Sequence, residues 1–125
     1  NESINFCKSL KKEYNFKIIK AISVKSLKDL EYANSYKNTV DWILFDYKDD
    51  LLAGGTGKSF DWSLLDKSSL NFNWILSGGL DYNNVIKAIK GIGAKAVDVS
   101  SGVEITKGIK SIELIKRFCN KINNI

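Results

Sequence analysis

The chain has 125 residues, which suits a single domain, and 44% of them are hydrophobic, enough for a sizeable core. It contains no histidine, which excludes histidine-based catalysis and most zinc sites, and no apolar run approaches the roughly 20 residues that span a bilayer. The net charge of +5 comes from lysines spread along the whole chain, so we expect a solvated surface that mildly attracts anionic small molecules rather than a nucleic-acid interface.

The start of the chain and the cysteines bear on where the protein works. The sequence begins with Asn1 and contains no methionine, from which we expect a fragment or a processed product. Its first residues are too polar for a signal peptide. Cys7 and Cys119 lie in stretches of helical periodicity without metal-binding spacing, so we expect reduced thiols, no bound metal and a cytoplasmic protein.

Short apolar runs alternate with amphipathic stretches along the chain. Ser3 is expected to cap a first helix, in which apolar residues recur every three positions. Asp81 is expected to cap a later helix that Gly91 and Gly93 end. The other predicted helices cover residues 26–36, 61–65 and 111–122, and the predicted strands cover residues 16–22, 40–45, 73–76 and 94–99.

Strands that alternate with helices predict a parallel sheet, because each return between parallel strands needs a crossover. The predicted strands are almost continuously apolar, as strands covered on both faces are. The α/β pattern fits either a barrel or a doubly wound sheet. In both architectures ligands bind at the carboxyl ends of the strands, which directs attention to the residues that follow each strand.

Asp46 ends the second predicted strand, in the run WILFD. A carboxylate at that place can reach into the mouth of a barrel and act as a general acid or base. The structural alternative, a cap or an ion pair with Lys48, is about equally compatible with the position alone.

A glycine-rich loop, AGGTGKS, follows this strand. A phosphate-binding P-loop needs a glycine five residues before Gly57, where Leu52 stands, and it needs a strand directly before it. The glycine content favours a mobile loop that closes over a ligand, and a plain flexible loop is the bland alternative. This predicted mobile loop comprises Gly54, Gly55, Thr56 and Gly57.

Two more segments follow the third and fourth predicted strands. Gly78 and Gly79 bring backbone N–H groups close to a ligand, and a helix N-terminus that favours anions comes next. Ser100 and Ser101 occupy the corresponding place one strand later and add two hydroxyls. A tight turn would explain the glycines equally well, but the pair of segments predicts a shared phosphate site.

Together these segments resemble phosphoribosylanthranilate isomerase, a (β/α)8 TIM-barrel enzyme of tryptophan biosynthesis. The resemblance covers essentially the whole chain and is specific in its combination of motifs. The matching runs are NES at the start, KIIKAI, WILFD, GGTGKSFDW, SGGLDYNNV and AVDVSSGVE.

The resemblance implies that residues 1–125 form the C-terminal half of one barrel domain, with strands five to eight. Family enzymes convert N-(5-phosphoribosyl)anthranilate to the carboxyphenylamino-deoxyribulose phosphate by an Amadori rearrangement, an aldose–ketose isomerisation without cofactor or metal. Asp46 matches the aspartate that protonates the ribose ring oxygen, and Asp98 matches an aspartate that lines the substrate site. The glycine pair and the serine loop match the family's phosphate site: Gly78, Gly79, Ser100 and Ser101.

The family's general base is a cysteine in a K-x-C-G segment of the first strand, followed by an arginine, and this chain has neither segment. Cys7 lies in a helical context instead. We therefore expect no activity without the missing N-terminal half-barrel. Strands near Ile19 and Val97 would expose open edges, so we expect pairing with that half, self-association into a homo-oligomer, or aggregation. The alternatives are a non-catalytic ribose-phosphate-binding half-barrel module and a P-loop-like nucleotide binder.

Overall fold

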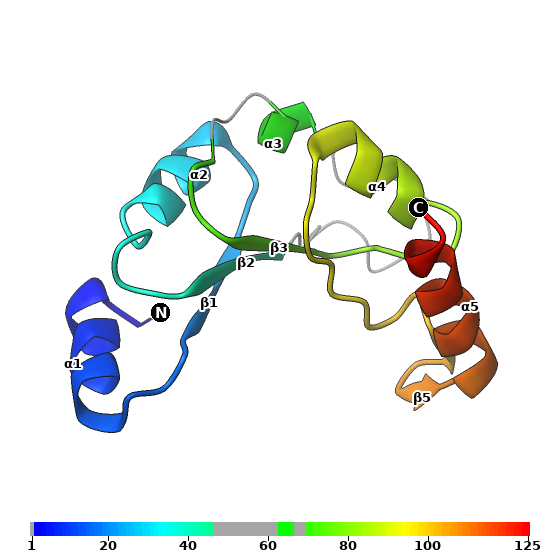
Figure 1. Ribbon diagram of the computed structural model, residues 1–125, viewed down its shortest axis with the longest axis horizontal. Helices are drawn as coiled ribbons and strands as arrows, with labels where there is room; N and C mark the ends of the chain where they lie inside the picture. Colours follow the sequence, from blue (N-terminus) through cyan, green and yellow to red (C-terminus); the bar gives the residue numbers. More distant parts are fainter. Residues whose placement is uncertain (1, 47–62, 67–69) are drawn as a thin grey trace.

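The computed structural model describes residues 2–46, 63–66 and 70–125. Helices and strands alternate along most of this part of the chain, as predicted (Figure 1). The elements are α1 (Ile4–Tyr14), β1 (Ile19–Ser23), α2 (Leu27–Asn34), β2 (Trp42–Asp46), α3 (Ser63–Asp66), β3 (Trp74–Ser77), α4 (Val85–Ile92), β4 (Glu104–Thr106), β5 (Ile109–Lys110) and α5 (Ile112–Asn123).

The main sheet is parallel and its strands lie in sequence order, β1-β2-β3. Ile19 pairs with Trp42 at one end of β1, and Ser23 pairs with Asp46 at the other. Along β1 and β2 every second residue is buried, and Ile22 and Phe45 lie on the buried face. A sheet built in this way places the carboxyl ends of all three strands at one edge.

The fourth predicted strand, residues 94–99, is wrong as a regular strand. The segment forms a single parallel bridge, between Val97 and Leu76 of β3. Two hydrogen bonds hold it there: Leu76 N–H donates to Ala96 O at 3.0 Å, and Asp98 N–H donates to Leu76 O at 2.7 Å. The segment borders β3 on one side and has no strand on its other side within the described residues, so it lacks half the ladder bonds of an inner strand.

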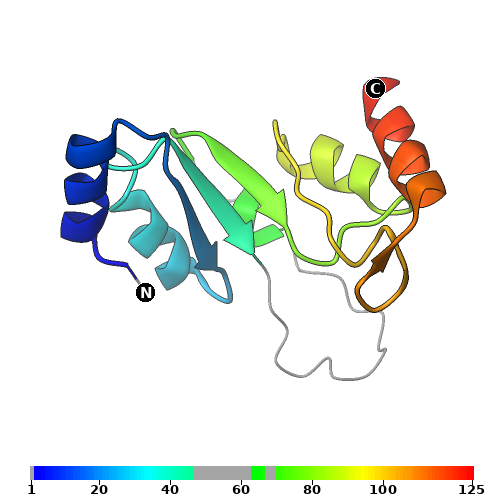
Figure 2. The same cartoon turned by 90° about the horizontal axis from the view of Figure 1, so that it is seen from below.

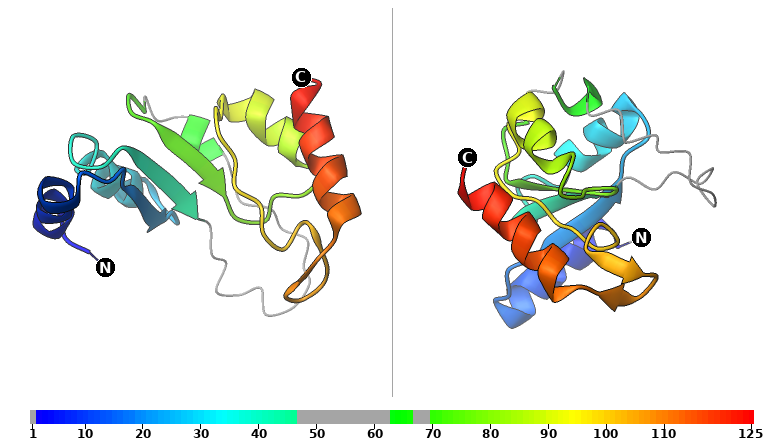
Figure 3. Two further views of the ribbon diagram at one scale, coloured as in Figure 1. Left: turned by 60° about the horizontal axis from the view of Figure 1, so that its bottom comes forward. Right: turned by 90° about the vertical axis from the view of Figure 1, so that its right-hand side faces the viewer.

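One face of the sheet is covered by helices. Figure 1 shows α2, α3 and α4 on the same side of the sheet, and Figure 3 shows this layer from two further directions. The core lies between the sheet and these helices. It contains Ile22, Ile43, Phe45 and Leu76 from the strands and Leu30, Ala33, Leu65 and Ala88 from the helices.

The opposite face of the sheet is more open. Ile19, Ala21 and Ser23 alternate with the core residues of β1 and are exposed. Helices α1 and α5 lie at opposite ends of the molecule (Figure 2). Among the helices of the described residues, none has the length and apolar character needed to cross a bilayer.

Of the two predicted helix caps, Ser3 is confirmed and Asp81 is wrong; the cap of α5 was not predicted. Ser3 accepts a hydrogen bond from Phe6 N–H at the start of α1, and Ser111 accepts one from Leu114 N–H at the start of α5. The cap of α4 is Asn84 rather than Asp81. Asp81 stabilises the preceding turn instead, because its carboxylate accepts from the N–H groups of Asn83 and Asn84.

The end of α4 also differs in detail from the prediction. Gly91 lies inside the helix, and Gly93 alone ends it, with a left-handed φ of 68°. Its N–H donates to Ile89 O at 2.9 Å, which satisfies a carbonyl of the last turn.

An antiparallel hairpin, β4–β5, lies between the serine loop and α5 and was not predicted. Glu104 pairs with Lys110, and Thr106 pairs with Ile109. Gly108 turns the chain with φ 85°, a conformation that glycine adopts without steric cost.

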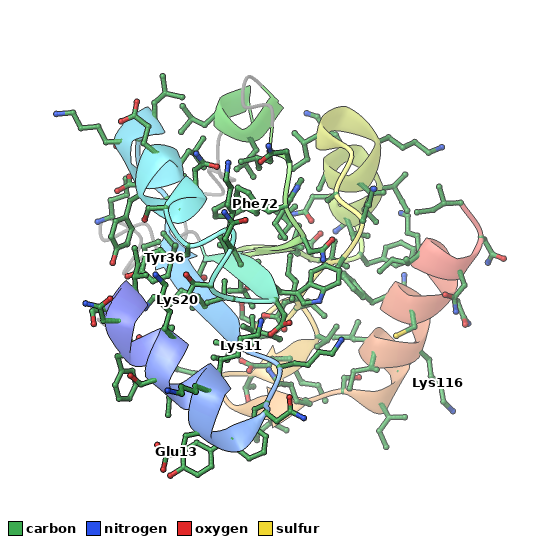
Figure 4. All side chains as sticks on the ribbon, turned by 60° about the vertical axis from the view of Figure 1, so that its left-hand side comes forward. Lys11, Glu13, Lys20, Tyr36, Phe72 and Lys116 are labelled. Carbon is green, nitrogen blue, oxygen red and sulfur yellow. The ribbon has the colours of Figure 1, made fainter. Side chains whose placement is uncertain are left out.

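A buried lysine connects the start of the chain to the sheet. Lys20 of β1 has a side chain only 8% exposed, and its ammonium donates to Glu2 at 2.6 Å. The hydroxyl of Tyr36 donates to Glu2 O at 2.9 Å, and Figure 4 shows Lys20 and Tyr36 between α1 and α2. The hydrogen bond from Lys20 lowers the pKa of Glu2 to about 2, and the hydrogen bond with Tyr32 raises the pKa of Tyr36 to about 12.

Candidate active site at the carboxyl ends of the strands

Four polar side chains form a row across the carboxyl ends of the strands. Ser23 pairs with Asp46, and Asp46 pairs with Ser77, so the three residues share one register position. Register partners in neighbouring strands project from the same face of a sheet. Asp98 extends the row, because Ser77 Oγ donates to Asp98 Oδ2 at 2.9 Å. We call Ser23, Asp46, Ser77 and Asp98 the polar row.

Asp46 is half-buried in this row. Its carbonyl oxygen accepts from Val24 N–H at 3.3 Å, which fixes the end of β2 against the end of β1. No residue in the described part of the chain donates a hydrogen bond to its carboxylate. Asp46 also borders a cavity of about 550 Å³, lined by Glu2, Lys20, Ala21, Ile22, Ser23, Asp29, Tyr32 and Asp46. A carboxylate held at its backbone and open at its side chain can exchange a proton with a bound ligand.

The segment that follows the glycine pair lies beside the end of the serine loop. Asp81 and Gly102 form a parallel bridge between the two segments. The contact is so close that a Cβ on Gly102 would lie 1.9 Å from the carbonyl oxygen of Leu80. Only a glycine fits where two backbones approach in this way.

The donors that an anion could use come from the glycine pair. Gly78 and Gly79 have φ values of 93° and 65°. Within the described residues, nothing accepts a hydrogen bond from either of their N–H groups. The N–H groups of Asn83 and Asn84 at the approach to α4 are already bonded to Asp81. These two N–H groups are therefore not available to a ligand, because the protein's own carboxylate occupies them.

The serine loop is attached to the β4–β5 hairpin by Lys110. Its ammonium donates to Ser100 O at 2.8 Å, to Ser100 Oγ at 2.9 Å and to Glu104 Oε1 at 2.6 Å. The Lys110 hydrogen bond, together with one from Gly108 N–H, holds the pKa of Glu104 below its usual value. The role of Lys110 was not predicted from the sequence. The Lys107-Gly108 step between residues of strand character was the available signal for a hairpin that would bring it back to the loop.

Replacing Gly102 by alanine is expected to destabilise the protein by ~1–3 kcal/mol, because the new methyl group meets backbone rather than a movable side chain. Gly91→Ala is the matched control. It has open space around its Cβ position inside α4, so the same change there is expected to stabilise the protein by ~0.5–1 kcal/mol. Urea unfolding of the two variants and the parent measures both effects. Equal free energies of unfolding for Gly102→Ala and the parent would contradict the close approach of the two loops.

One predicted element cannot be compared with the structure. The proposed mobile loop, Gly54, Gly55, Thr56 and Gly57, lies outside the described residues, as does Lys48. The same residues would form the alternative P-loop, so that interpretation also cannot be compared with the structure.

The fold and the site define a parallel β/α protein whose candidate ligand groups gather at the carboxyl ends of its strands. The family model described as N-(5'phosphoribosyl)anthranilate (PRA) isomerase matches residues 3–121. The chain belongs to this family, which confirms the resemblance found in the sequence.

Solved structures and curated relatives agree with this assignment. The phosphoribosyl anthranilate isomerase of Thermotoga maritima is 38% identical and superimposes with a TM-score of 0.84, over 100% of this chain and 59% of its own. The isomerase of Pyrococcus furiosus is 27% identical with a TM-score of 0.76, over 100% of this chain and 60% of its own. The curated isomerase of Petrotoga mobilis is 40% identical over all 125 residues, and that of Rhodospirillum rubrum is 45% identical over 113.

The likeness to these solved isomerases confirms the α/β fold class and places the chain with TIM-barrel proteins. The chain spans 58% of the length of the Petrotoga mobilis relative and 52% of the Rhodospirillum rubrum relative.

Proposed function

We propose that residues 1–125 are the C-terminal half of a phosphoribosylanthranilate isomerase barrel and supply the acid and phosphate sides of its active site. The observation that carries the proposal is the polar row beside the paired glycine and serine loops. A solved relative, 34% identical to this chain, was crystallised with reduced 1-(o-carboxyphenylamino)-1-deoxyribulose 5-phosphate, which supports a phosphorylated ligand.

Asp46 is the general acid in this proposal. Ring opening of a phosphoribosylamine needs a proton on the ribose ring oxygen as the C–O bond breaks, and a carboxylic acid at the mouth of the strands can deliver it. Asp98, already bonded to Ser77, lines the same opening and binds the substrate. The N–H groups of Gly78 and Gly79 and the loop of Ser100 and Ser101 hold the phosphate.

The general base is the part that the proposal assigns to the missing N-terminal half. Cys7 is unsuited to that role, because its side chain is 3% exposed and packs in the core on α1. The outer edge of β1 has no partner strand within the described residues, and Ile19 beside it is 56% exposed. An open edge next to apolar surface is the kind of feature that recruits another chain segment.

Complementation tests the proposal. The chain is expressed alone, or together with the N-terminal half of the Petrotoga mobilis relative, in bacteria that lack the isomerase. Growth without tryptophan is expected only when both halves are present. We call the active combination the completed isomerase. The N-terminal half alone is the control, and growth with this chain alone would contradict the division of roles.

The state of the isolated chain gives a second readout. Light scattering at micromolar concentration is expected to find self-association or aggregation, since four βα units cannot close a barrel. A stable monomer that unfolds cooperatively would show that the open edge is already protected, and the half-barrel proposal would fail.

A non-catalytic ribose-phosphate-binding module is the second candidate. One observation favours it: both proposed phosphate-binding segments lie within this chain and meet at the Asp81–Gly102 bridge, whereas no cysteine lies in the polar row. Calorimetric titration with ribose 5-phosphate, inorganic phosphate and ATP separates the candidates. Binding of the ribose phosphate without complementation would support the module, and preference for ATP would support a nucleotide binder instead.

A further inference from the structure

We propose that Lys110 is a positioning residue for the phosphate group, because it orients the Ser100 hydroxyl as a hydrogen-bond donor toward the bound ligand. The inference rests on the proposed phosphate site and adds to it a residue from outside the two binding loops. Lys110 lies on β5 of the hairpin, ten positions beyond Ser100.

The orientation follows from the hydrogen bonds of the ammonium group. A lysine ammonium has three N–H donors and no acceptor, and Lys110 directs them at Ser100 O, Ser100 Oγ and Glu104 Oε1. Ser100 Oγ must accept in this contact, since an ammonium cannot. The hydroxyl hydrogen therefore points elsewhere, and no residue in the described part of the chain accepts it.

A free hydroxyl rotates and can present either a hydrogen or a lone pair, and only the hydrogen suits a phosphate oxygen. The lysine contact occupies one of the two lone pairs of the Ser100 hydroxyl, so before the ligand arrives its hydrogen has two staggered positions instead of three. Preorganised donors of this kind lose little freedom on binding, so the interaction is stronger than one from a freely rotating hydroxyl.

The ammonium also contributes positive charge directly behind the serine loop. Its partner Glu104 is 14% exposed in the side chain and neutralises part of that charge at 2.6 Å. The two residues thus have opposite predicted effects on a bound phosphate: Lys110 attracts and orients, whereas Glu104 repels at longer range.

Because Lys110 and Glu104 have opposite predicted effects on a bound phosphate, variants of the two residues distinguish a positioning role of Lys110 from a purely structural role in the hairpin. If the Lys110–Glu104 pair served only to hold β4 against β5, removal of either charge would loosen the serine loop and weaken binding. If Lys110 acts on the phosphate through Ser100, removal of the Glu104 charge leaves that action intact.

The test measures the affinity of the completed isomerase for ribose 5-phosphate and for ribose. Lys110→Met is expected to weaken ribose 5-phosphate binding about tenfold, the order of one hydrogen bond to a charged group, with little change for ribose. Lys107→Met is the matched control, because it removes the same charge from the same hairpin without a contact to Ser100, and less than about a twofold effect is expected. Glu104→Gln is expected to leave the affinity unchanged or to tighten it.

A double-mutant cycle completes the experiment. Ser100→Ala is expected to weaken binding by itself, and Lys110→Met is expected to add little in the Ser100→Ala background. Equal losses for Lys110→Met and Lys107→Met, or a loss for Glu104→Gln as large as that for Lys110→Met, would overturn the inference. If the parent binds ribose 5-phosphate no better than ribose, the phosphate site fails and the inference fails with it. Normal parent binding with an unaffected Lys110→Met variant overturns the inference alone.

Discussion

Asp46→Asn is expected to lower kcat of the completed isomerase by at least ~10²-fold, the typical loss when a positioned proton donor is removed. Asparagine keeps the size and the hydrogen-bonding capacity of the side chain, but it cannot release a proton to the ribose ring oxygen. The half-buried place in the polar row is retained, because the strand end is held by the backbone bond from Val24. KM is expected to change much less than kcat, since the loss falls on the transition state.

Glu31→Gln provides the matched control, because it makes the same chemical change at an exposed position of α2, away from the polar row. Its turnover is expected to equal that of the parent. Steady-state kinetics with both variants decide the matter. Near-parental turnover of Asp46→Asn would end the assignment of this residue as the acid.

Gly79→Asp is expected to raise the Kd for ribose 5-phosphate by at least ~10²-fold. The new carboxylate would lie where the phosphate oxygens are proposed to bind, and juxtaposed like charges cost several kcal/mol, with each 1.4 kcal/mol equal to a factor of ten. The φ of 65° at this position adds backbone strain for any residue with a Cβ.

The strain has a close internal control. Gly93 has a φ of 68° and open space around its Cβ position, but it ends α4 far along the chain from the glycine pair. Gly93→Asp therefore carries the same charge and nearly the same strain away from the ligand, and its Kd is expected to match that of the parent. If both variants bind equally well, the phosphate does not lie at Gly79.

Local sequence signals predicted most of the elements well. The predicted serine cap of α1 forms the expected bond, because capping depends on residues three positions apart. The contact between the segments of the glycine pair and the serine loop also follows from the order of the strands. The expectation that both faces of the strands are covered is wrong for β1, in which every second residue is exposed.

The failures involve information that is not local. Residues 94–99 have the composition of a strand, but they make only one bridge to β3, and composition does not show how far two segments pair. Asp81 was a reasonable cap by type, yet Asn84 lies nearer the first helical residue and Asp81 bonds the turn before it. The contact between Lys110 and Ser100 exists because the β4–β5 hairpin brings Lys110 back to the serine loop. Since the hairpin was not predicted, the spacing of the two residues in the sequence could not predict their contact.

The strand order has a consequence for how the chain reaches this structure. Each strand of the main sheet pairs with the one that precedes it in the sequence, so no long-range pairing has to wait for the end of the chain. A domain built from such neighbouring contacts can fold progressively, and its early units can form on the ribosome before the later ones are synthesised.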